Sequence, residues 1–111
     1  MVLVTTKLKI PHWRRAEVLK TIRGLLSPTR VEHGCVEIAC FQDIDDSDSL
    51  ILLEAWDTRG NLDRHIRSDR YRGFLCLLEA AAERPSVEFH EVAATAGIET
   101  IERARSTETG Q

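Results

Sequence analysis

The segment from Leu50 to Trp56 is apolar on both of the faces that a β-strand would present. Successive side chains of a strand point to opposite faces, and Glu54 is the only charged residue among leucine, isoleucine, alanine and tryptophan. Both faces therefore need apolar cover. A chain of 111 residues builds one core, with enough helices for one face of a small sheet. We expect a second copy of the chain to cover the other face.

Hydrophobic periodicity divides the chain into the elements of a ferredoxin-like fold. An alternating pattern predicts a first strand at residues 2–10, and helical spacing from Trp13 to Leu26 predicts a helix that ends near Ser27-Pro28. The other expected elements are strands at 35–42, 50–56 and 87–92, a short helix after Asp57-Thr58, and a helix from Ser68-Asp69 to about Glu83. This order is the βαββαβ arrangement of an α+β fold with a four-stranded antiparallel sheet.

The C-terminal residues are expected to lie outside this arrangement. We place one ferredoxin-like domain at residues 1–95, and a short helix with a tail at residues 96–111. Ile98 and Ile101 of this helix are expected to pack on this subunit or on its partner. Residues 106–111 are expected to form a loose end.

The charge pattern disfavours two classes of partner. The net charge is −3, with acidic and basic residues interspersed, so the chain offers no basic surface for nucleic acid or anionic lipid. The first residues lack the pattern of a signal peptide, and no apolar run approaches the length of a membrane span. We expect a cytoplasmic protein with no nucleic-acid or membrane partner.

Two groups of potential metal ligands fit no known metal site. Cys35, Cys40 and Cys76 have no Cys-x-x-Cys spacing and no histidine placed to complete a zinc site. We expect buried, reduced thiols, with a redox or catalytic thiol as the alternative. The acidic segment 43–49 lacks the central glycine and closing glutamate of an EF-hand loop, so a solvated hairpin is expected there.

Several short groups of residues, taken in order, resemble one family. They are Thr29-Arg30, residues 32–35, Glu54 to Trp56, His65 to Ser68, and Tyr71 to Leu75. From about Val2 to Val92 the sequence resembles the antibiotic biosynthesis monooxygenase family of the dimeric α+β barrel superfamily. The resemblance implies a homodimer in which two four-stranded sheets pack face to face as a barrel. It also implies a pocket between the sheet and the helices of each subunit.

The resemblance narrows the expected activity. Characterised relatives include monooxygenases that use dioxygen on polycyclic phenols or quinols with neither metal nor flavin, whereas other relatives degrade haem, isomerise small metabolites or have no assigned reaction. A haem-degrading branch uses an asparagine on the first strand, a tryptophan on the second helix and an iron-ligating histidine on the third. Here His65 replaces the tryptophan, Leu75 replaces the ligand, and the first strand has no asparagine. Leucine cannot bind iron, so haem degradation is not expected.

Five residues are candidates for the site. His65 is the candidate catalytic base, because histidine titrates near neutrality and this one lies on the apolar side of its predicted helix; a structural histidine is the alternative. Glu54 and Trp56 share a strand face and would bind substrate, unless Trp56 is core and Glu54 pairs with an arginine. Tyr71 and Phe74 are further candidate substrate contacts, with packing roles as the alternative.

These observations lead to one expected function and two rivals. We expect a dimeric monooxygenase without cofactor or metal, acting with dioxygen on a small aromatic, phenolic or quinol-like substrate. The first rival is an isomerase that uses the same pocket. The second is a non-catalytic small-molecule-binding or stress protein of the same fold.

Overall fold

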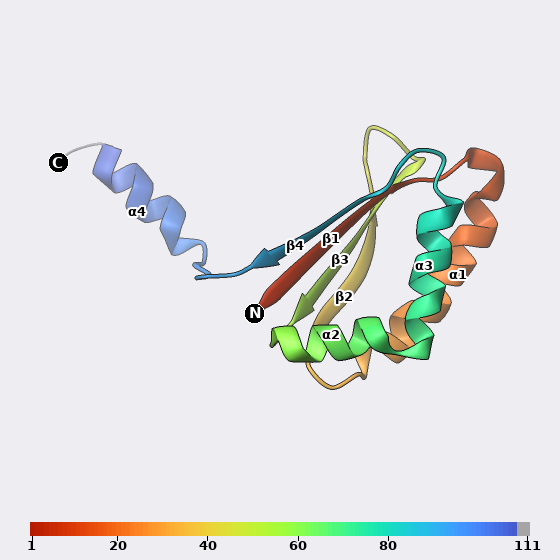
Figure 1. Cartoon of the computed structure of the whole chain (residues 1–111). Coiled ribbons are helices and arrows are strands. Elements are labelled where there is room, and N and C mark those ends of the chain that lie inside the picture. Colours follow the sequence, from red (N-terminus) through yellow and green to blue (C-terminus); the bar gives the residue numbers. More distant parts are fainter. Residues whose placement is uncertain (109–111) are drawn as a thin grey trace.

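A four-stranded antiparallel sheet, in the order β2–β3–β1–β4, carries helices on one face (Figure 1). The structure, a computed structural model, describes residues 1–108. The elements are β1 (Val2–Lys9), η1 (His12–Arg14), α1 (Arg15–Arg30), β2 (Cys35–Gln42), β3 (Ser49–Trp56), α2 (Arg59–Arg67), η2 (Asp69–Tyr71), α3 (Arg72–Ala80), β4 (Ser86–Glu91) and α4 (Glu99–Glu108), where η marks a single 3₁₀ turn. The predicted ferredoxin-like βαββαβ order is confirmed.

The hydrophobic core lies between the sheet and helices α1 and α3. In β1, Val4 and Leu8 are buried while Lys7 and Lys9 are exposed, because alternate side chains point to opposite faces. Burying one large aliphatic or aromatic side chain contributes about 1.5–3 kcal/mol, so this face supplies most of the drive to fold. The main buried cluster comprises Leu8, Ile10, Val18, Ile22, Leu25, Ile38, Leu50, Leu52, Phe74, Leu77 and Ala80.

The opposite face of the sheet has no helix over it (Figure 1). Ile51 and Leu53 of β3 point to this side and are only partly covered. Phe41, which pairs with Ile51, is more than half exposed. Of the two apolar faces of β3, one is therefore covered by helices, and the other is open in the single chain.

Helix α1 runs two residues beyond its predicted end. Proline lacks the N–H of a helical residue and its ring crowds the carbonyl four residues earlier, which made Pro28 a natural stop. Here Pro28 lies in the last turn of α1, where few further bonds depend on it. The buried Thr29 follows it and donates its hydroxyl to the carbonyl of Leu25 at 2.7 Å. The helix thus continues to Arg30.

Two expectations about burial were wrong. Trp13, expected to begin the apolar stripe of α1, is 83% exposed, because it lies in η1 before the helix starts. Cys76, expected to be buried, is exposed on the outer side of α3. Cys35 and Cys40 are partly buried, and all three thiols are free.

The ends of the last two helices also differ from prediction. Helix α3 ends at Ala80 rather than near Glu83, because the N–H of Ala82 donates to the carbonyl of Lys9 and not to a helical carbonyl. Helix α4 runs on to Glu108, so residues 106–108 are helical and not a loose end, and the rest of the expected loose end lies outside the described residues.

Helix α4 stands clear of the sheet (Figure 1). Ile98, in the turn before this helix, and Ile101, within it, are 80% and 60% exposed. The expectation that these side chains pack on their own subunit is therefore wrong, and their packing on a partner stays a prediction.

Gly34 gives a direct test of the turn between α1 and β2. Its φ is +90°, and a Cβ built there would lie 2.5 Å from Asn61 Cβ. We expect Gly34→Ala to lower the free energy of unfolding by about 1–3 kcal/mol, because both strain and overlap are introduced. Urea denaturation measures this change.

Gly24→Ala is the matched control. Gly24 lies within α1, and a Cβ added there would have no other atom within 4 Å beyond its own helix backbone and chain neighbours. Alanine there should leave stability unchanged or raise it by up to about 1 kcal/mol. Equal effects of the two substitutions would contradict the geometry of the turn.

Candidate functional site

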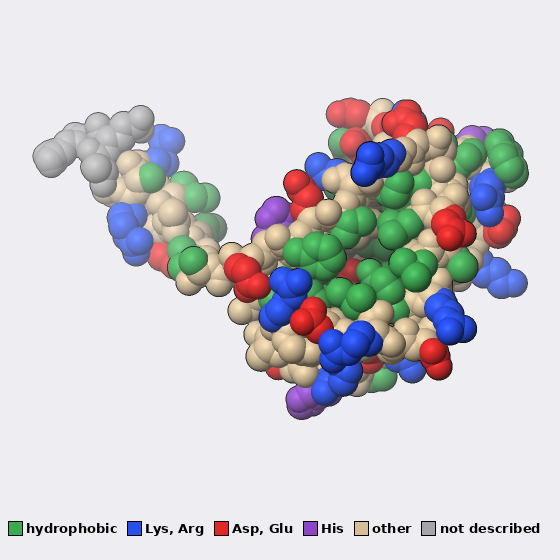
Figure 2. All heavy atoms as spheres, viewed as in Figure 1, with side chains coloured by type: hydrophobic (Ala, Val, Ile, Leu, Met, Phe, Trp, Pro, Cys, Tyr) green, Lys and Arg blue, Asp and Glu red, His purple; other side chains and the backbone are tan. Residues whose placement is uncertain are grey.

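A narrow pocket opens between the sheet and α3. Thr6, Leu52, Glu54 and Val87 line it from the strands, and Tyr71, Phe74, Leu77 and Leu78 line it from the η2–α3 side. Figure 2 shows a hollow on this face, ringed by apolar side chains, with an acidic side chain inside. Glu54 is the one acidic residue of the lining. The pocket therefore places a single carboxyl group against apolar walls.

The pocket is small in this structure. Its cavity volume, taken as the space open to the centre of a water molecule, is about 10 Å³, which is room for one water. An aromatic ring enters only if a side chain of the wall, such as Leu78 or Tyr71, moves outward. A larger hollow of about 350 Å³ lies elsewhere, but Lys7, Lys9 and Glu83 line it and it is wide open. The smaller pocket is the better candidate, because it is apolar and contains a buried acid.

Glu54 is buried, with an exposed fraction of 4%. The indole N–H of Trp56 donates to its Oε1 at 3.0 Å. Burial raises the pKa of the Glu54 carboxyl, and the negative charge of Glu32 raises it further. The hydrogen bond from Trp56 and the nearby His65 act in the opposite direction. The alternative that Glu54 pairs with an arginine is wrong, since its polar neighbours are Trp56 and His65.

His65 is enclosed by aromatic rings. Its exposed fraction is 1%. The imidazole stacks on Trp56 with ring centroids 4.6 Å apart, and meets the edges of Tyr71 and Phe74 at 5.2 Å each. His65 lies behind Glu54 and is not part of the pocket lining.

The two ring nitrogens of His65 have different surroundings. Nδ1 lies 2.9 Å and 3.1 Å from the two carboxylate oxygens of Glu32. A carboxylate only accepts, so Nδ1 carries the proton and donates it to Glu32. Nε2 is buried and has no hydrogen-bond partner, and the nearest acidic atom is Oε1 of Glu54 at 3.7 Å. The imidazole thus lies between two acids.

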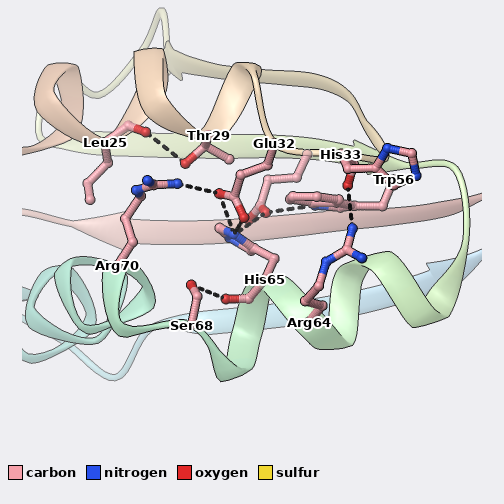
Figure 3. A network of polar contacts seen from close by, with 10 residues as sticks. Leu25, Thr29, Glu32, His33, Trp56, Arg64, His65, Ser68 and Arg70 are labelled. Carbon is pink, nitrogen blue, oxygen red and sulfur yellow. Dashed lines mark hydrogen bonds and ion pairs between the residues drawn. The ribbon is translucent and has the colours of Figure 1, made fainter.

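Glu32 connects His65 with the surface. It lies in the turn between α1 and β2, and its side chain is 19% exposed. Arg70 of η2, 45% exposed, places Nη1 3.3 Å from Oε2 of Glu32. Figure 3 shows Arg70 pointing toward Glu32, and Glu32 pointing toward His65. A line of polar groups therefore runs from the pocket to the surface.

Local signals in the sequence position His65. Thr58 caps the start of α2, because its hydroxyl accepts the N–H of Asn61 at 3.1 Å. Leu62 and His65, three residues apart, are the buried residues of this helix. The hydroxyl of Ser68 donates to the carbonyl of His65 at 2.7 Å and closes the helix. A short, capped helix thus holds the imidazole at a fixed depth.

A second set of contacts fixes the turn that carries Glu32. Arg64 of α2 donates to the carbonyl of His33 at 3.2 Å. The N–H of Asp57, at the end of β3, donates to the carbonyl of Gly34 at 2.9 Å. The turn is therefore tied both to α2 and to the strand that carries Glu54.

The structure brings all five predicted site residues together. Glu54, Tyr71 and Phe74 line the pocket, whereas Trp56 and His65 lie behind Glu54. Burial raises the pKa of the Tyr71 hydroxyl, and the charge of Glu54 adds to this effect. Two polar members of the site, Glu32 and Arg70, were not among the predicted site residues. They belong to turns, where periodicity gives no signal, although Glu32 belongs to one of the short groups that carry the family resemblance.

The described part of the chain contains neither a metal-ligand cluster nor a membrane-spanning helix. Across residues 1–108, no three His, Cys, Asp or Glu side chains come together as ligands for one ion. Within the same residues, every helix is too short or too polar to cross a bilayer.

Comparison with known proteins gives one family and a shared fold. The family model described as antibiotic biosynthesis monooxygenase matches residues 1–75. The uncharacterized protein sll1783 of Synechocystis is 23% identical over 74 residues, which are 67% of this chain and 50% of that protein. The chain thus spans about half the length of this relative.

Two solved structures show the likeness of the fold. A conserved protein from Methanosarcina mazei has a TM-score of 0.77 and 26% identity, over 81% of this chain and 90% of that one. An antibiotic biosynthesis monooxygenase has a TM-score of 0.76 and 23% identity, over 85% of this chain and 100% of that one. Both structures therefore share the overall fold of this chain.

Glu54→Gln tests the burial of the acid. Because burial raises the pKa of Glu54 from its ordinary value of 4.5, the folded state holds this proton more tightly than the unfolded state. The stability that the protonated acid contributes is complete below pH 4.5 and is lost as the pH rises through the folded-state pKa. Glutamine stays neutral, so the variant should gain stability relative to the unchanged protein as the pH rises.

Chemical denaturation between pH 4 and pH 8 measures this difference. The exposed Glu79→Gln on α3 is the control, and its difference from the unchanged protein should not follow the same trend. A difference for Glu54→Gln that is constant with pH would show that Glu54 is not held in a proton-retaining environment.

Proposed function

The chain belongs to the antibiotic biosynthesis monooxygenase family, and from this premise we propose that it is a monooxygenase acting on a small aromatic, phenolic or quinol-like substrate. In this proposal dioxygen is the second substrate, and neither metal nor flavin takes part. The observation that carries the proposal is the buried carboxyl group of Glu54 at the end of an apolar pocket.

The proposed reaction needs a base and a dry cavity. Glu54 in its ionised form takes the proton of a phenolic hydroxyl, which leaves an electron-rich phenolate and a neutral acid. The phenolate gives an electron to dioxygen, and the two radicals combine at a ring carbon that carries hydrogen. One oxygen atom stays on that carbon as a carbonyl, and the other leaves as water with the two hydrogens removed. The substrate supplies all four electrons, so no external reductant is needed.

The pocket walls support this chemistry. Leu52, Phe74, Leu77 and Val87 keep water away from the anion, which favours its reaction with dioxygen over reprotonation. Tyr71 also lines the pocket, and in this proposal its hydroxyl donates a hydrogen bond to the phenolate oxygen. The aromatic wall and the neutralised acid together suit a planar, weakly acidic substrate.

In this proposal Trp56 and His65 act through Glu54 and do not contact the substrate. The indole N–H of Trp56 holds Oε1 of Glu54, and the unpartnered Nε2 of His65 faces the same oxygen. Both therefore influence when Glu54 is ionised. The sequence predicted His65 as the catalytic base. In this proposal Glu54 is the base, and His65 acts through it.

Oxygen uptake tests the proposed function. The purified, metal-stripped protein should consume dioxygen with at least one member of a panel of naphthols, anthrones and quinols. Glu54→Gln should lower the rate by about 100-fold or more, which is typical of a lost general base. His65→Asn, whose amide still donates to Glu32, should lower it less, and the exposed Glu79→Gln should not change it.

The outcomes separate the rival functions. Full oxygen uptake by Glu54→Gln would contradict the role of the pocket. Conversion of a panel member without oxygen uptake would favour the isomerase. Thermal protection by a panel member that stays chemically unchanged would favour the non-catalytic binding protein.

We further propose that the protein is a homodimer that packs the open sheet faces of two copies together. Ile51 and Leu53 of the central strand β3 and Phe41 of the edge strand β2 form an apolar group on this face, beside Lys7 of β1, which pairs with Ile51. An apolar group bordered by polar side chains is typical of a protein interface. This interface lies on the side of the sheet away from the pocket, so each subunit keeps its own site.

Leu53→Glu tests the dimer. A charge at the centre of the open face should weaken association by about 100-fold or more, because a buried charge without a partner costs several kcal/mol. Sedimentation velocity over a range of concentrations measures the change. Leu75→Glu, on the exposed side of α3, is the control and should leave the dimer intact. A dimer that survives Leu53→Glu would place the interface elsewhere.

A further inference from the structure

The unpartnered nitrogen of His65 requires an explanation. Buried polar atoms nearly always have a hydrogen-bond partner, and an exception points to strain or to function. Nε2 of His65 is buried and has none, although Oε1 of Glu54 lies 3.7 Å away. A histidine kept only for structure would be expected to use both nitrogens. Here one nitrogen is engaged by Glu32, and the other is left facing an acid.

The surroundings of His65 contain few other titratable groups. Glu32 faces it from the turn before β2, and Glu54 from β3. From η2, Arg70 faces Glu32, and Tyr71 meets the imidazole edge-on. Its remaining ring neighbours, on β3 and α3, are aromatic side chains that do not titrate. The imidazole thus lies between the two acids, with Nδ1 at Glu32 and Nε2 3.7 Å from Glu54.

We propose that Glu54, His65 and Glu32 form a proton relay that links the pocket with solvent beside Arg70. This inference rests on the proposed function for the source of the proton, which is the substrate hydroxyl. The relay itself is a property of the substrate-free protein. Glu54 contacts the substrate and is the catalytic residue, whereas His65 and Glu32 act through it.

The proton moves outward in three steps, and a proton returns by the same path. Glu54 accepts a proton from the substrate and becomes a neutral acid. It passes this proton to Nε2 of His65, and the imidazole releases the proton of Nδ1 to Glu32. Glu32 then gives a proton to water. On the return, Glu32 takes a proton from water and gives it to Nδ1, Nε2 gives its proton back to Glu54, and Glu54 gives it to the departing oxygen, which restores the starting tautomer. Both transfers require the 3.7 Å distance between Nε2 and Oε1 to shorten to hydrogen-bond distance.

The path leaves the protein away from the pocket. Glu32 and Arg70 are partly exposed and take no part in the pocket lining. A ring that fills the narrow pocket would block exchange of protons through its mouth. A second route lets Glu54 release its proton while the phenolate reacts, and take one up again for the departing oxygen, while the pocket stays dry.

Hydrogen exchange in the unchanged protein is the first test. The ring N–H of His65 and the indole N–H of Trp56 are both buried in the same aromatic stack. If the relay operates, the His65 proton exchanges with water at least about 100-fold faster than the Trp56 proton, which must wait for opening of the fold. Saturation transfer from water in ¹⁵N-labelled protein measures both rates. Equal rates would overturn the proposal.

Glu32→Gln is the second test. The glutamine carbonyl still accepts from Nδ1 but does not take up the proton, so exchange of the His65 ring proton should slow by about tenfold or more. Glu32→Asp keeps a carboxylate and should restore much of the rate, and Glu79→Gln should change nothing. If Glu32 only holds His65 in place, its replacement loosens the site, and exchange would be unchanged or faster. That result would overturn the relay.

These measurements need no substrate. If the relay passes both tests but the protein takes up no oxygen, the proposed function is contradicted and the relay is supported. If the protein takes up oxygen but fails both tests, the proposed function is supported and the relay is contradicted. The two proposals therefore fail separately.

Discussion

The burial of one carboxyl group on the covered face of the central strand determines the arrangement of the site. Ionised carboxylates are costly to remove from water unless charged or hydrogen-bonded neighbours compensate. Glu54 has the indole N–H of Trp56 and the imidazole of His65 for this purpose. His65 in turn needs Glu32, and Glu32 is held by Arg70 near solvent. Each outer polar group thus serves as the charged or hydrogen-bonding partner of the group that lies deeper in the protein.

The fold supplies the fixed distances that this arrangement needs. β3 carries Glu54 and Trp56 two residues apart on one face, so the indole reaches the carboxylate directly. Capped at both ends, α2 holds His65 against that face. A turn with one glycine at positive φ brings Glu32 to the other side of the imidazole. The open face of the sheet contributes no residue to the pocket lining, and in the proposed dimer it is the contact surface.

The sequence predicted the elements well because their patterns are local. Alternation in β1 and helical spacing in α1 depend only on which side of one element meets the core, so the order of elements followed directly. Ends and surface positions were less certain. Trp13 was placed in the core because its spacing fitted the helix, whereas the chain turns before the helix begins. Periodicity carries no information about such a turn.

The sequence analysis named the residues that meet around Glu54, but not Glu32 and Arg70, and not which residues line the pocket and which lie behind it. Glu54 and His65 were both identified, yet the depth of each depends on how α2 is rotated against the sheet, which no local pattern encodes. The outer residues Glu32 and Arg70 lie far apart in the chain, on separate turns. Only the tertiary structure shows that they meet, and that a path from the pocket to solvent results.

In the proposed function, substrate binds against Glu54, with His65 behind it. NMR chemical-shift mapping with 1-naphthol as the probe tests this binding mode, following the carboxyl carbon of Glu54 and the methyl groups of the protein. We expect the largest shifts at Glu54 and at the pocket residues Leu77 and Val87, with smaller shifts at the His65 ring. Shifts centred on the open face around Leu53, or on the charged hollow near Lys7 and Glu83, would contradict it.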